Sequence, residues 1–89
     1  MYREIWKFNI QPNIEIEIPI GGEILTTQEQ YGEIYIWILV DPSAEKEKRT
    51  FEVYSTGLPI YYDMGIERRY IGTVQLYTDK LVFHVFELM

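Results

Sequence analysis

The sequence predicts an all-β protein of about seven short, mostly antiparallel strands that form a small sandwich or a partly open barrel. Two observations lead to this prediction. Apolar and polar side chains alternate along short runs, as they do in strands, where successive side chains point to opposite faces. Glycine, proline and asparagine stand between the runs, where turns need them. The 89 residues suit one domain, so a single β domain is predicted over residues 1–89.

Seven runs carry the strand pattern. They span residues 2–10, 14–20, 23–31, 34–40, 50–55, 70–77 and 81–87. The second run places isoleucines on one face and Glu15, Glu17 and Pro19 on the other, which is typical of a strand with one buried and one wet face. Because proline has no N–H to donate, the end of this run at Pro19 is predicted to be a sheet edge or the end of the strand.

The fourth run, residues 34–40, is apolar on both faces. Isoleucine and valine occupy one face, and Tyr35, Trp37 and Leu39 occupy the other. A strand of this kind lies in the middle of a sheet, or it keeps one face for another molecule. We expect the second face to lie under the long loop after the fifth run, under the last hairpin, or against a second subunit. Its three residues are therefore candidate interface residues.

Three connections have patterns of their own. Asp41 can cap a helix, and proline and good helix formers follow it, so one short helical turn is predicted near residues 42–48. Residues 56–69 hold glycines and a proline without a sustained period, which predicts a long loop, and loops of this length often carry function. A tight connection at residues 78–80 predicts that the last two strands form a hairpin.

The composition argues against several classes of protein. A net charge of −6 argues against binding to duplex nucleic acid, because contact with its phosphates needs a basic face. Without cysteine there is no disulfide and no thiolate metal site, which fits the reducing cytoplasm. No apolar run approaches the roughly 18 residues of a membrane-spanning helix, and the start of the chain lacks the pattern of a signal peptide. A soluble protein with no membrane partner is expected.

Residue types that perform catalysis are scarce, and we do not expect an enzyme. His84 is the only histidine, and it lies in an alternating apolar run, where a hydrogen-bonded core or rim histidine is the favoured interpretation. Ser43 and Ser55 lack the pattern of a hydrolase nucleophile. Glu15 and Glu17 are better explained as solvated surface groups than as a cation site. We therefore predict no catalytic residue, no metal ion and no cofactor.

The candidate ligand-binding residues gather at the end of the fifth predicted strand and in the loop that follows it. They are Ser55, Thr56, Gly57, Tyr61, Tyr62, Arg68 and Arg69. Gly57 has no side chain, so backbone N–H groups at this strand end can approach an anion closely, beside the hydroxyls of Ser55 and Thr56. Aromatic rings near arginines suit a nucleobase stacked on a ring, with its phosphate held by a guanidinium. The same residue types are enriched in subunit interfaces, so a homo-oligomer contact is the alternative.

Several segments spread over the chain resemble a family of short uncharacterised proteins encoded by tailed phages and prophages. The segments are Ile5–Phe8, Glu23–Leu25, Trp37–Pro42, Arg49–Phe51, Ser55–Ile60, Tyr70–Thr73 and Phe83–Glu87. The resemblance implies no catalytic residue. In that family a histidine often precedes the proline of the Thr-Gly-x-Pro segment, where this chain has Leu58. A site that uses this histidine would be altered here.

The phage setting that this resemblance implies suggests a small non-enzymatic accessory protein in the host cell cytoplasm. Our leading hypothesis is a counter-defence binding protein, expected to be a homo-oligomer, that sequesters a small nucleotide-like signal at the candidate ligand-binding residues. The first alternative is an inhibitor that contacts a host protein through the acidic segment Glu15–Glu33. The second alternative is a structural or virion component.

Overall fold

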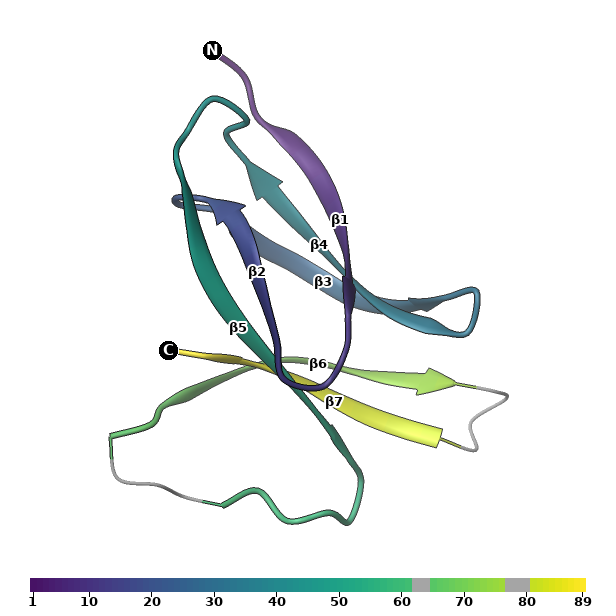
Figure 1. Ribbon diagram of the computed structural model, residues 1–89. Helices are drawn as coiled ribbons and strands as arrows, with labels where there is room; N and C mark the ends of the chain where they lie inside the picture. The colour runs from purple at the N-terminus through teal and green to yellow at the C-terminus, as the bar shows by residue number, and fades with distance from the viewer. Residues whose placement is uncertain (62–64, 77–80) are drawn as a thin grey trace.

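Two antiparallel sheets pack face to face in the computed structural model, which describes residues 1–61, 65–76 and 81–89 (Figure 1). These residues contain seven strands and no helix. The strands are β1 (Glu4–Ile10), β2 (Ile14–Pro19), β3 (Glu23–Gln30), β4 (Glu33–Val40), β5 (Lys46–Ser55), β6 (Arg68–Leu76) and β7 (Leu81–Leu88). One sheet has three strands in the order β1-β4-β3, and the other has four in the order β2-β5-β7-β6. The predicted all-β fold is confirmed, and it takes the form of a sandwich.

The core lies between the sheets and is centred on one face of β4. Ile36, Ile38 and Val40 have 0% of their surface exposed, because strand alternation points all three toward the other sheet. Phe51 from β5 and Val85 from β7 are equally buried and belong to the same cluster. β4 lies between β1 and β3, so its position in the middle of a sheet is confirmed.

The second apolar face of β4 points away from the core. Tyr35, Trp37 and Leu39 are half-buried on the outer surface of the three-stranded sheet, flanked by β1 and β3. The two segments of this chain that were predicted to cover this face, the long loop and the last hairpin, belong to the other sheet. Val82 and Phe86 of the last hairpin lie on β7, and the long loop leaves the same sheet after β5 (Figure 1). A second subunit stays the predicted cover for this face.

The short helical turn predicted near residues 42–48 is wrong. Asp41 does accept hydrogen bonds from the backbone N–H and the hydroxyl of Ser43, at 2.9 and 2.7 Å, as a capping residue would. The chain then closes a turn, because the N–H of Ala44 donates to the carbonyl of Asp41, and β5 already begins at Lys46. The residues expected to extend the helix pair with β2 instead. A ladder of strand hydrogen bonds is more stable than an isolated helical turn.

A buried ion pair joins β5 and β7 on the inner face of the four-stranded sheet. Arg49 of β5 donates from Nε to Oε2 of Glu87 at 2.5 Å and from Nη2 to Oε1 at 2.8 Å. Its Nη1 donates to the carbonyl of Gly22, between β2 and β3, at 2.6 Å. The side chains are only 13% and 6% exposed. The hydrogen bond to Glu87 raises the pKa of Arg49 above its ordinary value, so the arginine stays charged inside the sandwich.

The edges of the two sheets meet at one side, where β3 packs against β6. Each of these strands has an irregularity in its register, between Ile24 and Thr26 in β3 and between Tyr70 and Gly72 in β6. Gly72 is needed at this contact, because a Cβ there would lie 2.8 Å from Cγ2 of Thr27. The other two edge strands, β1 and β2, lie at the far ends of their sheets.

Candidate ligand-binding site

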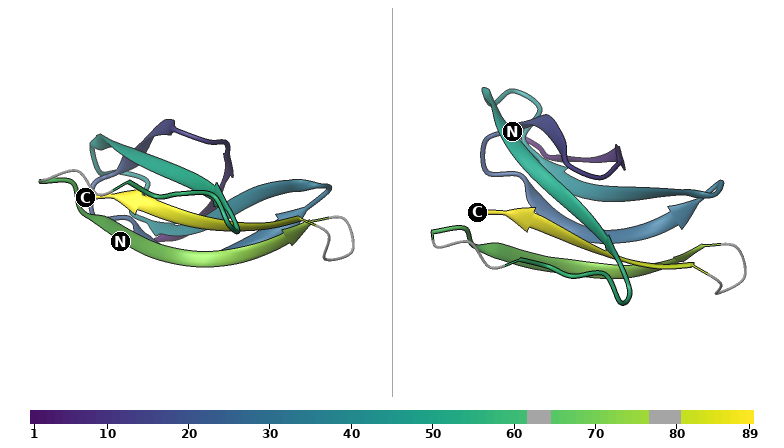
Figure 2. Two further views of the ribbon diagram at one scale, coloured as in Figure 1. Left: turned by 90° about the horizontal axis from the view of Figure 1, so that it is seen from below. Right: turned by 60° about the horizontal axis from the view of Figure 1, so that its bottom comes forward.

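The outer face of the four-stranded sheet carries a mixed polar and aromatic surface. Strand alternation turns Phe51 of β5 into the core and Glu52 and Tyr54 outward. The register with β7 sets Glu52 beside Phe86 and Tyr54 beside His84. Glu52 is nevertheless only 9% exposed. Arg68 donates to its carboxylate, and the described parts of the loop between β5 and β6 pass along this side of the four-stranded sheet (Figure 2).

Arg68 and Glu52 form an ion pair at the base of this face. Nε of Arg68 donates to Oε1 of Glu52 at 2.6 Å, and the two side chains are 14% and 12% exposed. Nη1 of Arg68 donates to the backbone carbonyl of Tyr61 at 3.2 Å, which ties the loop to the sheet. The hydrogen bond to Glu52 raises the pKa of Arg68. Burial, and then the hydrogen bond with Glu52, raises the pKa of Tyr54, so its phenol stays neutral at ordinary pH.

Three aromatic rings from neighbouring strands form what we call the aromatic platform: Tyr54, Phe86 and Tyr70. The ring of Phe86 lies edge-on to both tyrosines, with centroids 5.9 Å from Tyr54 and 5.5 Å from Tyr70. Tyr70 is 56% exposed. Beside the platform lies a hollow of about 430 Å³. It is lined by Ile60, Ile66, Glu67, Arg68 and Phe86. The loop, the ion pair and the platform therefore bound one concave surface.

His84 lies next to this surface within a chain of hydroxyl groups. Its Nε2 is 2.7 Å from Oγ1 of Thr56, and its Nδ1 is 3.0 Å from Oγ1 of Thr73. The hydroxyl of Tyr70 lies 2.5 Å from the same oxygen of Thr73. A neutral imidazole donates from one nitrogen and accepts at the other, so either tautomer satisfies both threonines. The interpretation of His84 as a hydrogen-bonded histidine is confirmed.

The anion site predicted at the end of the fifth strand does not assemble as expected. Ser55 follows the alternation of β5 to the core side and pairs with Phe83. The N–H of Thr56 donates to the carbonyl of Val82, and the N–H of Leu58 donates to the carbonyl of Ser55. Gly57 does adopt the left-handed backbone, with a φ of 92°. This glycine serves a turn, and the neighbouring N–H groups are occupied within the protein.

The two predicted arginines lie on opposite faces of the sheet. Both were expected in the loop, but β6 begins at Arg68, so Arg68 and Arg69 alternate like any strand neighbours. Arg68 joins the loop-covered face, where it meets Tyr61. Arg69 is set beside Glu87 at the layer junction and lines hollows at that end of the sandwich. Tyr62 lies outside the described residues. Of the predicted set, Thr56, Tyr61 and Arg68 border the concave surface.

Four residues of the concave surface were not predicted to act together: Glu52, Tyr54, His84 and Phe86. Each lies on a strand whose alternation is visible in the sequence, on the side opposite the core. The missing information was that β5 pairs with β7, because this pairing joins segments far apart in the chain. Once that neighbour relation is known, the alternation alone brings the four side chains to one face.

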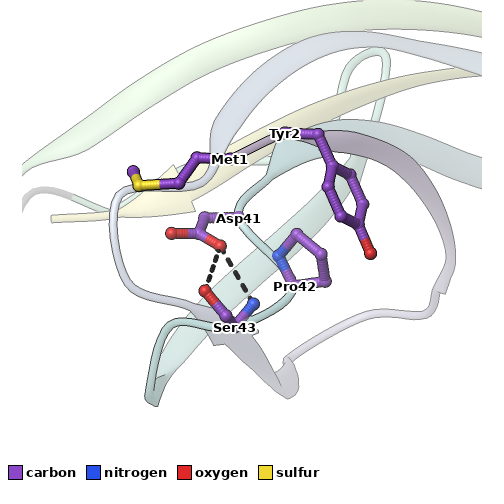
Figure 3. A pocket seen from close by; sticks show the side chains of 5 residues that line it. All are labelled: Met1, Tyr2, Asp41, Pro42 and Ser43. Carbon is purple, nitrogen blue, oxygen red and sulfur yellow. Dashed lines mark hydrogen bonds between the residues drawn. The ribbon is translucent and has the colours of Figure 1, made fainter.

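A second hollow, of about 230 Å³, lies beside the N-terminus and has a simpler explanation (Figure 3). Its lining is Met1, Tyr2, Asp41, Pro42 and Ser43. The carboxylate of Asp41 accepts both hydrogen bonds from Ser43, and these bonds lower its pKa. One oxygen of this carboxylate, Oδ1, is therefore engaged in the turn before β5.

The described residues lack two further features. No three histidine or acidic side chains among residues 1–61, 65–76 and 81–89 gather where a metal ion would bind. In the same part of the chain, no helix has the length and apolar character needed to cross a membrane. The concave surface of the four-stranded sheet is thus the candidate site that the described geometry supports best.

Comparison with known proteins places the chain in a family. No curated protein and no solved structure matches the sequence. A family described as a domain of unknown function, DUF7352, matches residues 1–89. Because this match extends over the whole chain, the chain belongs to that family.

Proposed function

We propose that this protein is a non-enzymatic binding protein that holds a flat ring, such as that of a nucleobase-like small molecule, on the outer face of its four-stranded sheet. The aromatic platform is the observation that carries the proposal. Its outermost ring, Tyr70, is 56% exposed and packs against Phe86, which lines the hollow. Stacking of a base on an aromatic side chain contributes about 1–3 kcal/mol and suits any flat ring.

The hollow has the size and lining of a small-molecule site. Its volume of about 430 Å³ falls within the roughly 300–1,000 Å³ typical of such sites. Ile60 and Ile66 supply apolar walls from the loop, and Arg68 and Glu67 supply polar groups at its rim. Mostly apolar walls with a few fixed polar groups are the usual pattern for ligand recognition.

The geometry favours recognition of a ring over recognition of a phosphate. A phosphate clamp needs arginine donors directed at the ligand. Arg68 instead gives its Nε to Glu52 and an Nη to the loop backbone. Arg69 lies on the other face of the sheet. The nucleotide-like ligand expected from the sequence is therefore narrowed to one that binds through its ring.

The alternative is an inhibitor that uses one acidic face. In the structure the acids of this segment divide between the two sheets. Glu15 and Glu17 lie on β2 in the four-stranded sheet, and Glu15 lies 3.8 Å from Lys48. Glu23 and Glu29 lie on β3 in the three-stranded sheet. The phage setting, the counter-defence role and the virion alternative rest on the sequence resemblance and stay predictions.

Thermal denaturation with a panel of free bases, nucleosides and nucleotides tests the proposal, because a ligand that binds the native state raises Tm. We expect at least one base-containing compound to raise Tm. A nucleoside and its 5′-monophosphate should raise it equally, since the guanidinium of Arg68 is already held by Glu52 and by the carbonyl of Tyr61. No shift across the panel, or a shift that requires the phosphate, would contradict the proposal.

Substitutions at Tyr70 locate the site. Tyr70→Leu should weaken binding about 5- to 150-fold, the loss expected for one stacked base, whereas Tyr70→Phe keeps the ring and should retain most of the affinity. Tyr2→Leu is the matched control, because Tyr2 is also largely exposed, at 69%, and lies far along the chain from the platform. Equal loss of affinity in Tyr70→Leu and Tyr2→Leu would place the ligand elsewhere.

A further inference from the structure

The two sheets end in four edge strands, and three of these edges are protected against pairing with another chain. Edge strands expose unpaired backbone N–H and C=O groups, and proteins protect them with proline, outward charges or bulges. β2 carries Pro19 and the exposed Glu15 and Glu17. β3 and β6 each contain a register irregularity, and they pack against each other.

The fourth edge strand, β1, has neither a proline nor a register irregularity, and its charged residues are the single acid Glu4 and the single base Lys7. Its seven residues, Glu4–Ile10, contain no proline and pair with β4 in an unbroken register. Among the residues that the structure describes, no strand pairs with its other side (Figure 1). Lys7 does not guard the edge, because its Nζ lies 4.7 Å from the centre of the Tyr35 ring and donates to Gln30 at 2.7 Å. The charge is folded back across the sheet.

Apolar side chains line both faces of this open edge. Ile5 is 58% exposed on the outer face of the sheet. Trp6 and Phe8 are half-buried and pack against the rim of the core. A strand added beside β1 would cover all three side chains while it pairs with the free backbone groups.

The charges along β1 favour a second copy of this chain as the partner that pairs with its open edge. Copies of a protein with a net charge of −6 repel one another, but least where bases balance the acids. Within β1 the one acid, Glu4, is balanced by the one base, Lys7, whereas β2 carries two acids and no base. In an antiparallel pair centred on Trp6, Lys7 faces Ile5 of the other copy and Glu4 faces Phe8. No like charges then lie opposite each other, and such opposition would be destabilising.

We infer that two copies of this chain dimerise through β1, antiparallel about a twofold axis, to form one six-stranded sheet from the two three-stranded sheets. A twofold contact of this kind uses the same surface on both subunits. The outer faces that carry Tyr35, Trp37 and Leu39 join into one continuous surface in this dimer. The ligand site on the opposite sheet is left open in both copies.

Light scattering and sedimentation at about 1–100 µM test the dimer. The full chain should show twice its 10.7 kDa mass. Ile5→Lys should convert it to a monomer with unchanged circular dichroism, because the new lysine faces Lys7 of the other copy. Leu25→Lys is the matched control: Leu25 is 46% exposed on another edge strand, and its variant should stay dimeric. A wild-type monomer throughout this range would overturn the inference.

Cross-linking tests the register, since the chain has no cysteine of its own. Under mild oxidation the double variant Ile5→Cys/Lys7→Cys should give a covalent dimer, because each new thiol faces its counterpart across the pair. The control variant Glu15→Cys/Glu17→Cys has the same spacing on the protected edge strand β2. It should run as a monomer on a denaturing gel. A dimer that survives Ile5→Lys and yields no cross-link would place the interface elsewhere and overturn the inference.

Discussion

Two arginine–glutamate pairs lie on opposite faces of the four-stranded sheet, and they use the same chemistry for different purposes. Arg49 and Glu87 lie between the layers, with two hydrogen bonds joining the side chains and a third reaching Gly22. Arg68 and Glu52 lie on the outer face, where the arginine reaches over β7 to the glutamate of β5. Nη1 of this arginine donates to the backbone carbonyl of Tyr61 in the loop.

The two pairs differ in the backbone carbonyl that Nη1 of each arginine binds, and this difference indicates their roles. Gly22 belongs to the connection between the sheets, so the Arg49–Glu87 pair holds the sandwich together. Tyr61 belongs to the loop beside the hollow, so the Arg68–Glu52 pair positions the candidate site. Loss of the inner pair should therefore affect folding most, and loss of the outer pair should affect binding most.

Glu87→Gln should produce the largest loss of stability. It leaves the guanidinium of Arg49 buried without its charged partner, and such a break costs about 3–5 kcal/mol. Urea denaturation measures the change in the free energy of unfolding. Glu17→Gln is the control: it alters an exposed acid of β2, and its effect should stay within about 0.5 kcal/mol. A loss for Glu87→Gln no greater than the control would show that the inner pair is not structural.

Glu52→Gln should affect binding more than stability. The variant leaves Arg68 without its carboxylate and frees the guanidinium to leave the loop carbonyl of Tyr61. We expect its Tm to fall less than that of Glu87→Gln, while its affinity for any ring ligand found in the thermal panel falls more. Calorimetric titration of both variants, at a temperature where each is folded, makes the comparison. The reverse order would assign the ligand to the inner pair.

The smallest expected effect is a pH dependence at Tyr54. Burial, and then the hydrogen bond with Glu52, raises its pKa in the folded protein. The corresponding stability is complete below the unfolded value of about 10 and is lost as pH rises through the folded value. Urea denaturation from about pH 8 to 11 should show a steeper loss for the wild type than for Tyr54→Phe. Equal slopes would mean that the outer face does not perturb this phenol.

Much of the fold is readable from the sequence, because alternation is a local property. Pro19 predicted a sheet edge or a strand end, and the two apolar faces of residues 34–40 predicted a central strand; β2 is an edge strand that ends at Pro19, and β4 is central. The helical turn near 42–48 failed because local capping signals say nothing of β2, with which those residues pair. Tertiary pairing overrode local preference there.

The candidate site was harder to predict, because it depends on which strands are neighbours. Arg68 and Arg69 look like one basic cluster in the sequence, but β6 divides them between two faces. Glu52 looks like an ordinary solvated acid, but Arg68 of β6 and Phe86 of β7 lie beside it in the folded sheet, where it is buried. The predicted tight connection at residues 78–80 lies outside the described residues.

The strand order also determines how this chain must fold. In the described parts of the chain, only two ladders join consecutive strands, β3 with β4 and β6 with β7. The other three, β1 with β4, β2 with β5 and β5 with β7, join distant segments. Distant pairing requires loop closure before any contact stabilises it, and proteins dominated by it fold in about milliseconds to seconds. Until β1 arrives, β4 has a free edge and apolar side chains on both faces. Refolding yield should therefore fall as protein concentration rises, since that exposed strand favours aggregation.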